Sequence, residues 1–297
     1  MKKNFILKTL ILTLSISLFS PLASINAKAA TTAQPDINAQ AAITMDLETG
    51  EIIYCKDADS KRYPASTTKL LTGLLLAENK QKSDEIAFTE SAKIQPEYSL
   101  NINFMHNSMK VGDTMSADDV MKGLLLFSGN DTAYMIADNV AGNSQKFADM
   151  MNAKAAELGC TNTHFNNCNG LPDPNHVVSA RDMALISREA IKNSMFRKIV
   201  GTVRYEIPPT NKHADPTPLN NHHQMISAYK GRQNLYEYCV GGKTGWTSDA
   251  GNTLVTFAEK DGMTLICVVM GCSAGGQYSD TRTLFDYCFD NFKLFNV

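Results

Sequence analysis

Short apolar runs separated by turn residues occur at both ends of the chain. Residues 41–45 and 51–54 are largely apolar, and a glycine-containing turn at residues 48–50 lies between them. This pattern predicts a β-hairpin near the N-terminus. Residues 252–259 and 263–271 flank an Asp-Gly turn, which predicts a second hairpin near the C-terminus.

The chain between these hairpins has mostly helical periodicity. Leucines at positions 70, 71, 74 and 75 share one face of a helix predicted over 67–79, which is apolar enough to be largely buried. Ser116 and Ser179 each precede an aspartate by three residues, which predicts helix N-caps, and Gly159 predicts a helix end. The other predicted helices cover 121–127, 132–140, 144–158, 179–193 and 282–295.

The order of elements predicts the fold class. Residues 203–207 alternate as in a strand, and four prolines between positions 208 and 218 predict a long loop after it. The elements run strands, helices, strands, without β-α-β alternation and without an internal repeat. We therefore predict an α/β fold of the α+β kind, with an antiparallel sheet built from both chain ends and a mostly helical inserted region.

Composition narrows the possible functions. The chain has 297 residues, of which 43% are hydrophobic and 20% charged, as in ordinary globular proteins. The formal net charge is -2 and no basic patch stands out, so a nucleic-acid partner is not expected. His222 and His223 are adjacent, but no second ligand pair has zinc spacing, so no metal site is expected.

Residues 1–29 have the features of a secretory signal peptide. Lysines at positions 2, 3 and 8 precede an apolar run over 9–19, and small residues end the segment at Ala27 and Ala29. The run is shorter than the roughly 20 residues that span a bilayer, which favours cleavage. We expect an exported protein with one domain over residues 30–297, and membrane contact only if the signal segment is retained.

The seven cysteines follow no metal-binding or redox spacing. Their odd number leaves at least one without an intrachain partner. Cys160 and Cys168 are close enough in sequence to bridge a loop, although the sequence does not decide this. Cys267 lies in an apolar run and is expected to be a small core residue.

Three short motifs follow one another along the chain. They are Ser66-Thr67-Thr68-Lys69, Ser128-Gly129-Asn130 and Lys243-Thr244-Gly245. Each alone is weak, because Ser-x-x-Lys recurs at 227–230 and Ser-x-Asn at 24–26 and 99–101. The ordered set is stronger, since the first motif opens a buried helix, the second interrupts a helical stretch and the third precedes a strand.

The first motif suits nucleophilic catalysis. Residues three apart share a helix face, so Ser66 and Lys69 are expected to lie side by side. A serine hydroxyl becomes a good nucleophile only when a base takes its proton. Lys69 can act as that base only when neutral, so its pKa must fall, and both burial and a second cation would lower it. Lys243 would be that second cation if it faces the same cleft.

The other two motifs suit contact with a substrate. Ser128 can relay a proton, and the amide of Asn130 can bind a substrate carbonyl or Lys69. Lys243 and Thr244 suit an anionic substrate end.

The third motif also places backbone groups near the reacting carbonyl. Gly245 lets the backbone run close to the substrate. The backbone N–H groups of Ser66 and Trp246 are expected to form an oxyanion hole.

The ordered motif set is typical of penicillin-binding proteins and class A β-lactamases. Longer strings around the motifs resemble the serine-type D-alanyl-D-alanine carboxypeptidases, which are low-molecular-mass penicillin-binding proteins. These strings are residues 64–72, 128–131, 169–174, 179–184 and 242–247. The resemblance covers roughly residues 35 to 295.

The resemblance implies a five-stranded β-lactamase/transpeptidase-like fold and an acyl-enzyme mechanism without a cofactor. The implied substrate is the peptidoglycan stem peptide ending in D-Ala-D-Ala, and the implied role lies in cell-wall synthesis and cell shape. Ser66 would attack the penultimate carbonyl with Lys69 as base, Ser128 and Asn130 would assist, and Lys243 and Thr244 would hold the terminal carboxylate. β-Lactams would acylate the same serine. Family members often continue into a β-rich domain and a membrane helix, neither of which is expected here.

Three alternatives stay open. A class A β-lactamase uses a glutamate-held water, yet residues 166–176 contain no glutamate, and Asp173 is their only acid. A D,D-endopeptidase or transpeptidase on the same scaffold is harder to separate from a carboxypeptidase. A non-catalytic peptidoglycan-binding protein is the alternative from a different class, and the presence of every motif residue argues against it.

Overall fold

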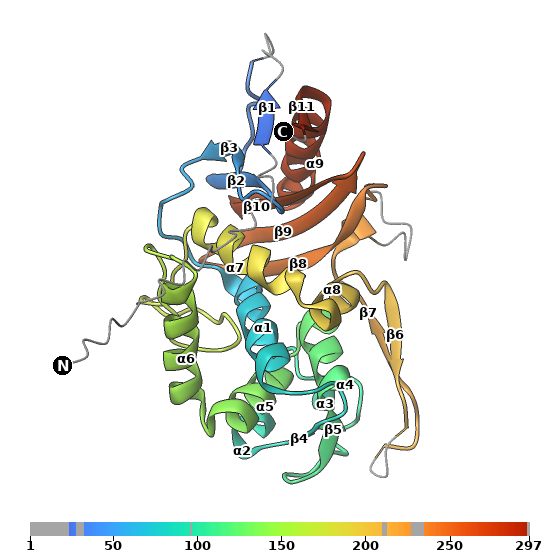
Figure 1. The fold of residues 1–297 in the computed structure, drawn as a ribbon. Helices are drawn as coiled ribbons and strands as arrows, with labels where there is room; N and C mark the ends of the chain where they lie inside the picture. The colour runs from blue at the N-terminus through green and yellow to red at the C-terminus, as the bar shows by residue number, and fades with distance from the viewer. Residues whose placement is uncertain (1–23, 28–32, 96, 210–212, 227–234, 296–297) are drawn as a thin grey trace, which may run out of the picture.

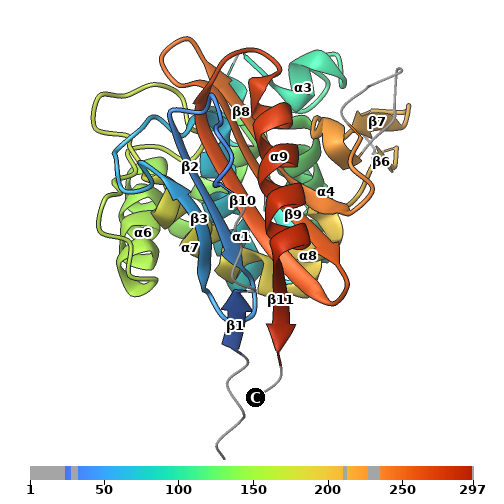
Figure 2. The same ribbon diagram turned by 90° about the horizontal axis from the view of Figure 1, so that it is seen from above.

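A five-stranded antiparallel sheet forms the centre of the molecule (Figures 1 and 2). The computed structural model describes residues 24–27, 33–95, 97–209, 213–226 and 235–295. The sheet order is β3-β2-β10-β9-β8. Its strands are β2 (Ala41–Asp46), β3 (Ile52–Lys56), β8 (Cys239–Thr247), β9 (Gly251–Lys260) and β10 (Met263–Cys272). The predicted sheet from both chain ends is therefore confirmed, including both hairpins.

Side chains of β10 divide between two hydrophobic cores because successive residues of a strand point to opposite faces. Leu265 and Cys267 pack with α9 (Gly276–Asn291), while Ile266 and Val268 belong to the core on the helical side. Figure 1 shows α9 on one side of the sheet, and α1 and α7 on the other. The sheet is thus covered on both faces.

The helical region lies between β3 and β8 in sequence. Its main helices are α1 (Lys69–Asn79), α4 (Ala117–Lys122), α5 (Asn130–Ala141), α6 (Ser144–Glu157), α7 (Ala180–Lys192) and α8 (Ser194–Val200). Shorter elements are α2 (Glu90–Lys93), α3 (Leu100–Asn103), the π-helix η2 (Gly123–Phe127), and the paired strands β4 (Glu85–Ala87) and β5 (Thr114–Ser116). The predicted N-caps are confirmed, because Ser116 and Ser179 accept hydrogen bonds from the N–H groups of Asp119 and Asp182.

Two expectations about the last third of the chain are wrong. The closing helix begins at Gly276 rather than at residue 282 and ends at Asn291, after which β11 (Phe292–Phe295) pairs with β1 (Ser24–Ala27). The expected proline-rich loop contains β7 (Thr217–Asn220), which pairs with β6 (Arg204–Ile207). A two-stranded sheet has only edge strands, where the missing N–H of a proline is tolerated.

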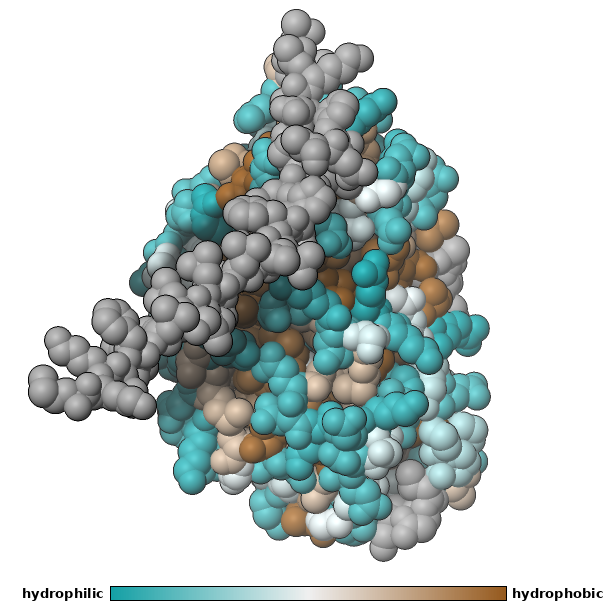
Figure 3. Space-filling model, viewed as in Figure 1, coloured by the Kyte–Doolittle hydropathy of each residue, from teal (hydrophilic) through white to brown (hydrophobic). Residues whose placement is uncertain are grey.

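The signal-peptide prediction falls largely on residues outside the described part of the chain. Of residues 1–29, the structure describes only β1. No helix in the described ranges is long and apolar enough to cross a membrane. Hydrophilic residues cover much of the face shown in Figure 3, with hydrophobic residues in smaller groups between them.

All seven cysteines lie among the described residues, and all are free thiols. The suggested bridge between Cys160 and Cys168 is therefore absent. The Cys160 thiol instead lies 3.6 Å from the carbonyl oxygen of Asp182, and Cys168 is buried. Cys267 is fully buried in β10, as predicted.

Candidate active site

The nucleophile candidate Ser66 lies in a short 3₁₀ turn, η1 (Ala65–Thr68), that leads directly into α1. Ala65 has a φ of 51°, a left-handed conformation that is uncommon for residues other than glycine. Such backbone strain is often found at functional sites. Lys69 is the first residue of α1, and its Nζ lies 3.0 Å from Ser66 Oγ.

Lys69 is completely buried and has three hydrogen-bond acceptors. Its Nζ donates to Ser66 Oγ, to Asn130 Oδ1 at 2.8 Å and to the carbonyl oxygen of Asn169 at 2.7 Å. Burial lowers the pKa of Lys69 from 10.5 to about 7, because the charged form is poorly solvated there. About half of the Lys69 amines are therefore neutral at pH 7, as a general base requires.

Ser128 and Asn130 lie at a corner between two helices. Ser128 ends η2 with a left-handed φ of 73°, and α5 begins at Asn130. Asn130 Oδ1 accepts from Lys69, and its Nδ2 donates to the carbonyl oxygen of Glu97 at 2.9 Å. Of the two roles predicted for this amide, the structure contains the bond to Lys69.

Lys243 lies on β8, and only 1% of its surface is exposed. Its Nζ donates to Ser128 Oγ at 3.0 Å and to the carbonyl oxygen of Thr244 at 2.9 Å. Burial, and then repulsion from Lys69, lower the pKa of Lys243 well below its usual value. Burial, one of the two causes expected from the sequence, is the leading cause of the low pKa of Lys69, and repulsion between the two lysines lowers the pKa of Lys243 further.

Gly245 allows β8 to pass directly beside the nucleophile. A Cβ atom at this position would lie 2.3 Å from Thr253 Oγ1 and 3.0 Å from the backbone nitrogen of Ser66. No L side chain fits such a space without displacing one of these atoms. The sequence predicted that Gly245 lets the backbone run close to the substrate. In the structure, Gly245 lets β8 run close to the turn that contains Ser66.

Two cavities meet at Ser66. One, of about 230 Å³, is also lined by Ser128, Thr244 and Gln277. The other, of about 270 Å³, is also lined by Asn130, Leu171 and Ser248. Tyr98 and Trp246 line both cavities, and Trp246 is 62% exposed. All eight site residues named from the sequence are thus in these cavity walls or buried directly behind them.

The loop over residues 166–176 contains contributors that the sequence did not reveal as site residues. The Asn169 carbonyl accepts from Lys69, and because it is a backbone atom, no side-chain pattern signals it. A Cβ at Gly170 would lie 1.8 Å from the Ala65 carbonyl oxygen, so this loop packs tightly on the Ser66 turn.

A buried histidine holds this loop to the start of α1. His176 Nδ1 accepts from the backbone N–H groups of Asn166 at 3.0 Å and Asn167 at 3.3 Å. Its Nε2 is therefore the protonated nitrogen, and it lies 2.9 Å from Thr68 Oγ1. Burial lowers the pKa of His176 to about 4, so the ring is neutral at pH 7.

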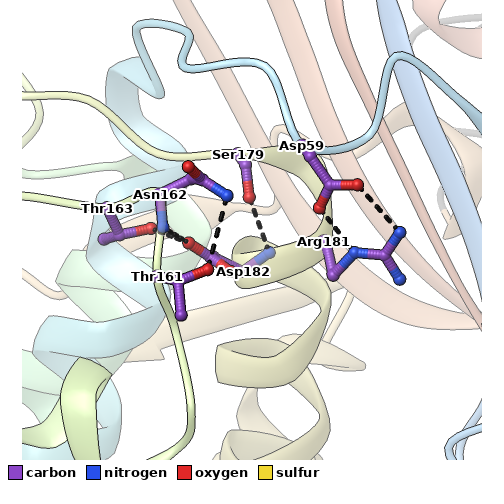
Figure 4. A network of polar contacts seen from close by, with 7 residues as sticks. All are labelled: Asp59, Thr161, Asn162, Thr163, Ser179, Arg181 and Asp182. Atoms are coloured by element: carbon purple, nitrogen blue, oxygen red, sulfur yellow. Dashed lines mark hydrogen bonds and ion pairs between the residues drawn. The ribbon is translucent and has the colours of Figure 1, made fainter.

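The motif at residues 179–184 positions two loops that lead into the site (Figure 4). Arg181 binds Asp59 through two hydrogen bonds of 2.6 and 3.0 Å, which hold the loop before Ser66. Asp182 Oδ2 accepts from Asn162 N and Thr163 Oγ1, both at 2.7 Å, which holds the segment before residues 166–176. Helix α7 therefore connects both walls of the site.

No cluster of three or more histidine, cysteine or acidic residues that could hold a metal ion occurs within the described ranges. His223 is buried, and its Nε2 lies 2.9 Å from Thr256 Oγ1.

The chain is similar to known proteins along most of its length. The D-alanyl-D-alanine carboxypeptidase family, Peptidase S11, matches residues 28–274. The D-alanyl-D-alanine carboxypeptidase DacF of Bacillus subtilis is 29% identical over 289 residues, which cover 97% of this chain and 72% of DacF. The chain spans 65% to 67% of the length of further carboxypeptidase relatives.

Solved structures of such enzymes share the fold. The D-alanyl-D-alanine carboxypeptidase from Mycobacterium tuberculosis H37Rv has a TM-score of 0.77 at 29% identity, covering 88% of this chain and 95% of that one. The Streptomyces K15 DD-transpeptidase has a TM-score of 0.75 at 28% identity, covering 87% and 100%. The chain belongs to the D-alanyl-D-alanine carboxypeptidase family of serine peptidases.

Proposed function

We propose that this chain is an extracytoplasmic carboxypeptidase that removes the terminal D-Ala from peptidoglycan stem peptides through an acyl-enzyme on Ser66. The single observation that carries this is the Lys69 amine, buried and with a pKa of about 7, lying 3.0 Å from the Ser66 hydroxyl. Residues 1–29 would direct export, and residues 30–297 would form one peptidase domain.

The arrangement supports a specific order of proton transfers. Neutral Lys69 takes the Ser66 proton as Oγ bonds to the penultimate D-Ala carbonyl, and the N–H groups of Ser66 and Trp246 bind the oxyanion. Because Ser128 Oγ accepts from Lys243, Ser128 can give its own proton to the leaving D-Ala nitrogen and take one from charged Lys243 in return. The C–N bond then breaks, and D-Ala leaves as a neutral amine. Lys69 next loses its proton through solvent, while Lys243 regains one. Neutral Lys69 then takes a proton from the water that attacks the Ser66 ester and returns it to Ser66 Oγ.

The terminal carboxylate of the substrate would control the charges of the two lysines. A carboxylate bound at Thr244 stabilises the charged form of Lys243. A charged Lys243 in turn favours neutral Lys69. Substrate binding would therefore place the proton on the lysine that binds the carboxylate and leave the base free.

Strand β8 suits an extended peptide substrate. It is an edge strand of the five-stranded sheet, and Ser66 lies beside it at Gly245. An extended peptide can pair with such an edge through backbone hydrogen bonds. This would align the scissile carbonyl with Ser66 while the carboxylate reaches Thr244.

Mass spectrometry after exposure to penicillin tests the proposal. The wild type should gain one penicillin mass on Ser66 and release D-Ala from a stem pentapeptide, whereas Ser66→Ala should do neither. Absence of labelling at Ser66 would refute the mechanism. Rapid penicillin turnover would indicate a β-lactamase, and transfer of the acyl group to an added amine would indicate a transpeptidase. Cleavage of cross-linked muropeptides would indicate an endopeptidase. Binding of the stem peptide without turnover would indicate a non-catalytic protein.

A further inference from the structure

A third cavity, of about 600 Å³, lies next to the catalytic ones. Its size is typical of a small-molecule site. Ser248 lines both this cavity and the catalytic cavity that contains Asn130, so the two adjoin at that residue. Its other polar wall residues are Gln40, Lys61, Arg62, Tyr63, Asp249 and Ser273.

Among the residues that the structure describes, one positive and one negative side chain in the cavity wall have no partner. Lys61 and Asp249 are both exposed, and the side chain of neither forms an ion pair or hydrogen bond with another residue in the described ranges. Arg62 also lines the cavity, but its guanidinium binds Asp57 at 2.8 Å and Gln40 at 2.5 Å. The Arg62 charge is therefore already balanced, and Lys61 and Asp249 are left to bind a ligand.

The position of the cavity along β8 indicates which part of a substrate would reach it. A strand rises about 3.3 Å per residue, so Thr247, the last residue of β8, lies roughly 10 Å beyond Thr244, and Ser248 follows it in the turn. In an extended peptide with its carboxylate at Thr244, the third residue from the end lies roughly 7 to 10 Å away. A side chain of four or more carbons on that residue would span the remaining distance.

We propose that this cavity, with Lys61 and Asp249 in its wall, is a subsite for the side chain of the residue before D-Ala-D-Ala. The subsite selects a side chain that ends in both a carboxylate and an ammonium group. Lys61 binds the carboxylate and Asp249 binds the ammonium. The inference rests on the proposed carboxypeptidase function. Because both groups are exposed, each ion pair is expected to change affinity by about fivefold at most.

The test measures D-Ala release from three pentapeptides that differ only in the third residue. The residues are meso-diaminopimelic acid, which has both charges, L-lysine, which has the ammonium alone, and L-norleucine, which has neither. For the wild type, kcat/KM should fall in that order by about tenfold overall. Lys61→Gln should lower kcat/KM for the diaminopimelate peptide to that of the lysine peptide. Asp249→Asn should lower kcat/KM for both charged peptides and leave kcat/KM for the norleucine peptide unchanged.

Matched controls separate this subsite from a general effect on the enzyme. Lys146→Gln removes an exposed lysine on α6 and should change none of the three rates. Acylation by benzylpenicillin, which lacks the side chain, should be the same in every variant. Equal wild-type rates for the three peptides would overturn the proposal, as would an equal loss on all three in either variant. Release of D-Ala from none of them would instead refute the proposed function.

Discussion

The pH dependence of acylation gives the most direct test of the role of Lys69. Its pKa of about 7 means that only about a tenth of the amine is neutral at pH 6 and about nine tenths at pH 8. If neutral Lys69 takes the Ser66 proton, the rate of acylation is proportional to that fraction. We therefore expect the rate to rise about tenfold from pH 6 to pH 8 and to level off above it.

The assay is the second-order rate of acylation by benzylpenicillin, followed by intact-protein mass spectrometry of quenched samples between pH 5 and 9. The penicillin carboxylate is ionised throughout this range, so the change must come from the protein. Histidine side chains also titrate here, and His222 lines the catalytic cavity. The variant His222→Gln should therefore keep the same rise.

Three results would contradict this role of Lys69. A rate that is constant between pH 6 and 8 would mean that Lys69 does not change its protonation state in the rate-limiting step. A rate that keeps rising about tenfold per pH unit up to pH 9 would mean that burial does not shift the pKa of the active amine from its usual value of 10.5. Loss of the rise in His222→Gln would assign it to the imidazole instead.

Three further predictions concern the surroundings of the site. Gly245→Ala should slow acylation of Ser66 at least tenfold and destabilise the fold by about 1–3 kcal/mol, measured by penicillin labelling and urea unfolding; normal labelling would contradict the close approach. His176→Ala leaves two partly buried N–H groups without their acceptor and should lower the free energy of unfolding by about 2 kcal/mol in the same assay, whereas an unchanged midpoint would show that other contacts hold the loop. Between pH 7 and 10.5 Lys69 is neutral in the folded protein but still protonated in the unfolded chain, so it makes the free energy of unfolding rise with pH. In Lys69→Met this rise should be smaller by about 1.4 kcal/mol per pH unit. An identical slope in the wild type and the variant would argue against the lowered pKa.

Local sequence signals predicted most of the sheet and the larger helices. The Asp-Gly pair between two apolar runs is sufficient to place β9 and β10, because few other arrangements suit those residues. The start of α9 was missed because Gly275, in a left-handed conformation, precedes it instead of a polar capping side chain. Strand β7 was missed because Pro218 argues against a strand unless its edge position is known.

The site was only partly predictable for a different reason. The pairing of Ser66 with Lys69 follows from helix geometry, since the two are three residues apart. The approach of Lys243 to Ser128, 115 positions earlier, depends on the tertiary fold, and only the family resemblance suggested it. The Asn169 carbonyl and the Glu97 carbonyl are backbone groups, so the residue types at those positions did not indicate their roles.

Because all seven cysteines are free thiols, this fold needs no disulfide bond to form. Six are at least partly buried, and Cys55 on β3 is exposed. The protein can therefore be expected to fold in reducing buffers, without an oxidant or a disulfide isomerase. Cys55 also offers a single accessible position for attaching a dye by maleimide chemistry, on a strand at the opposite edge of the sheet from β8.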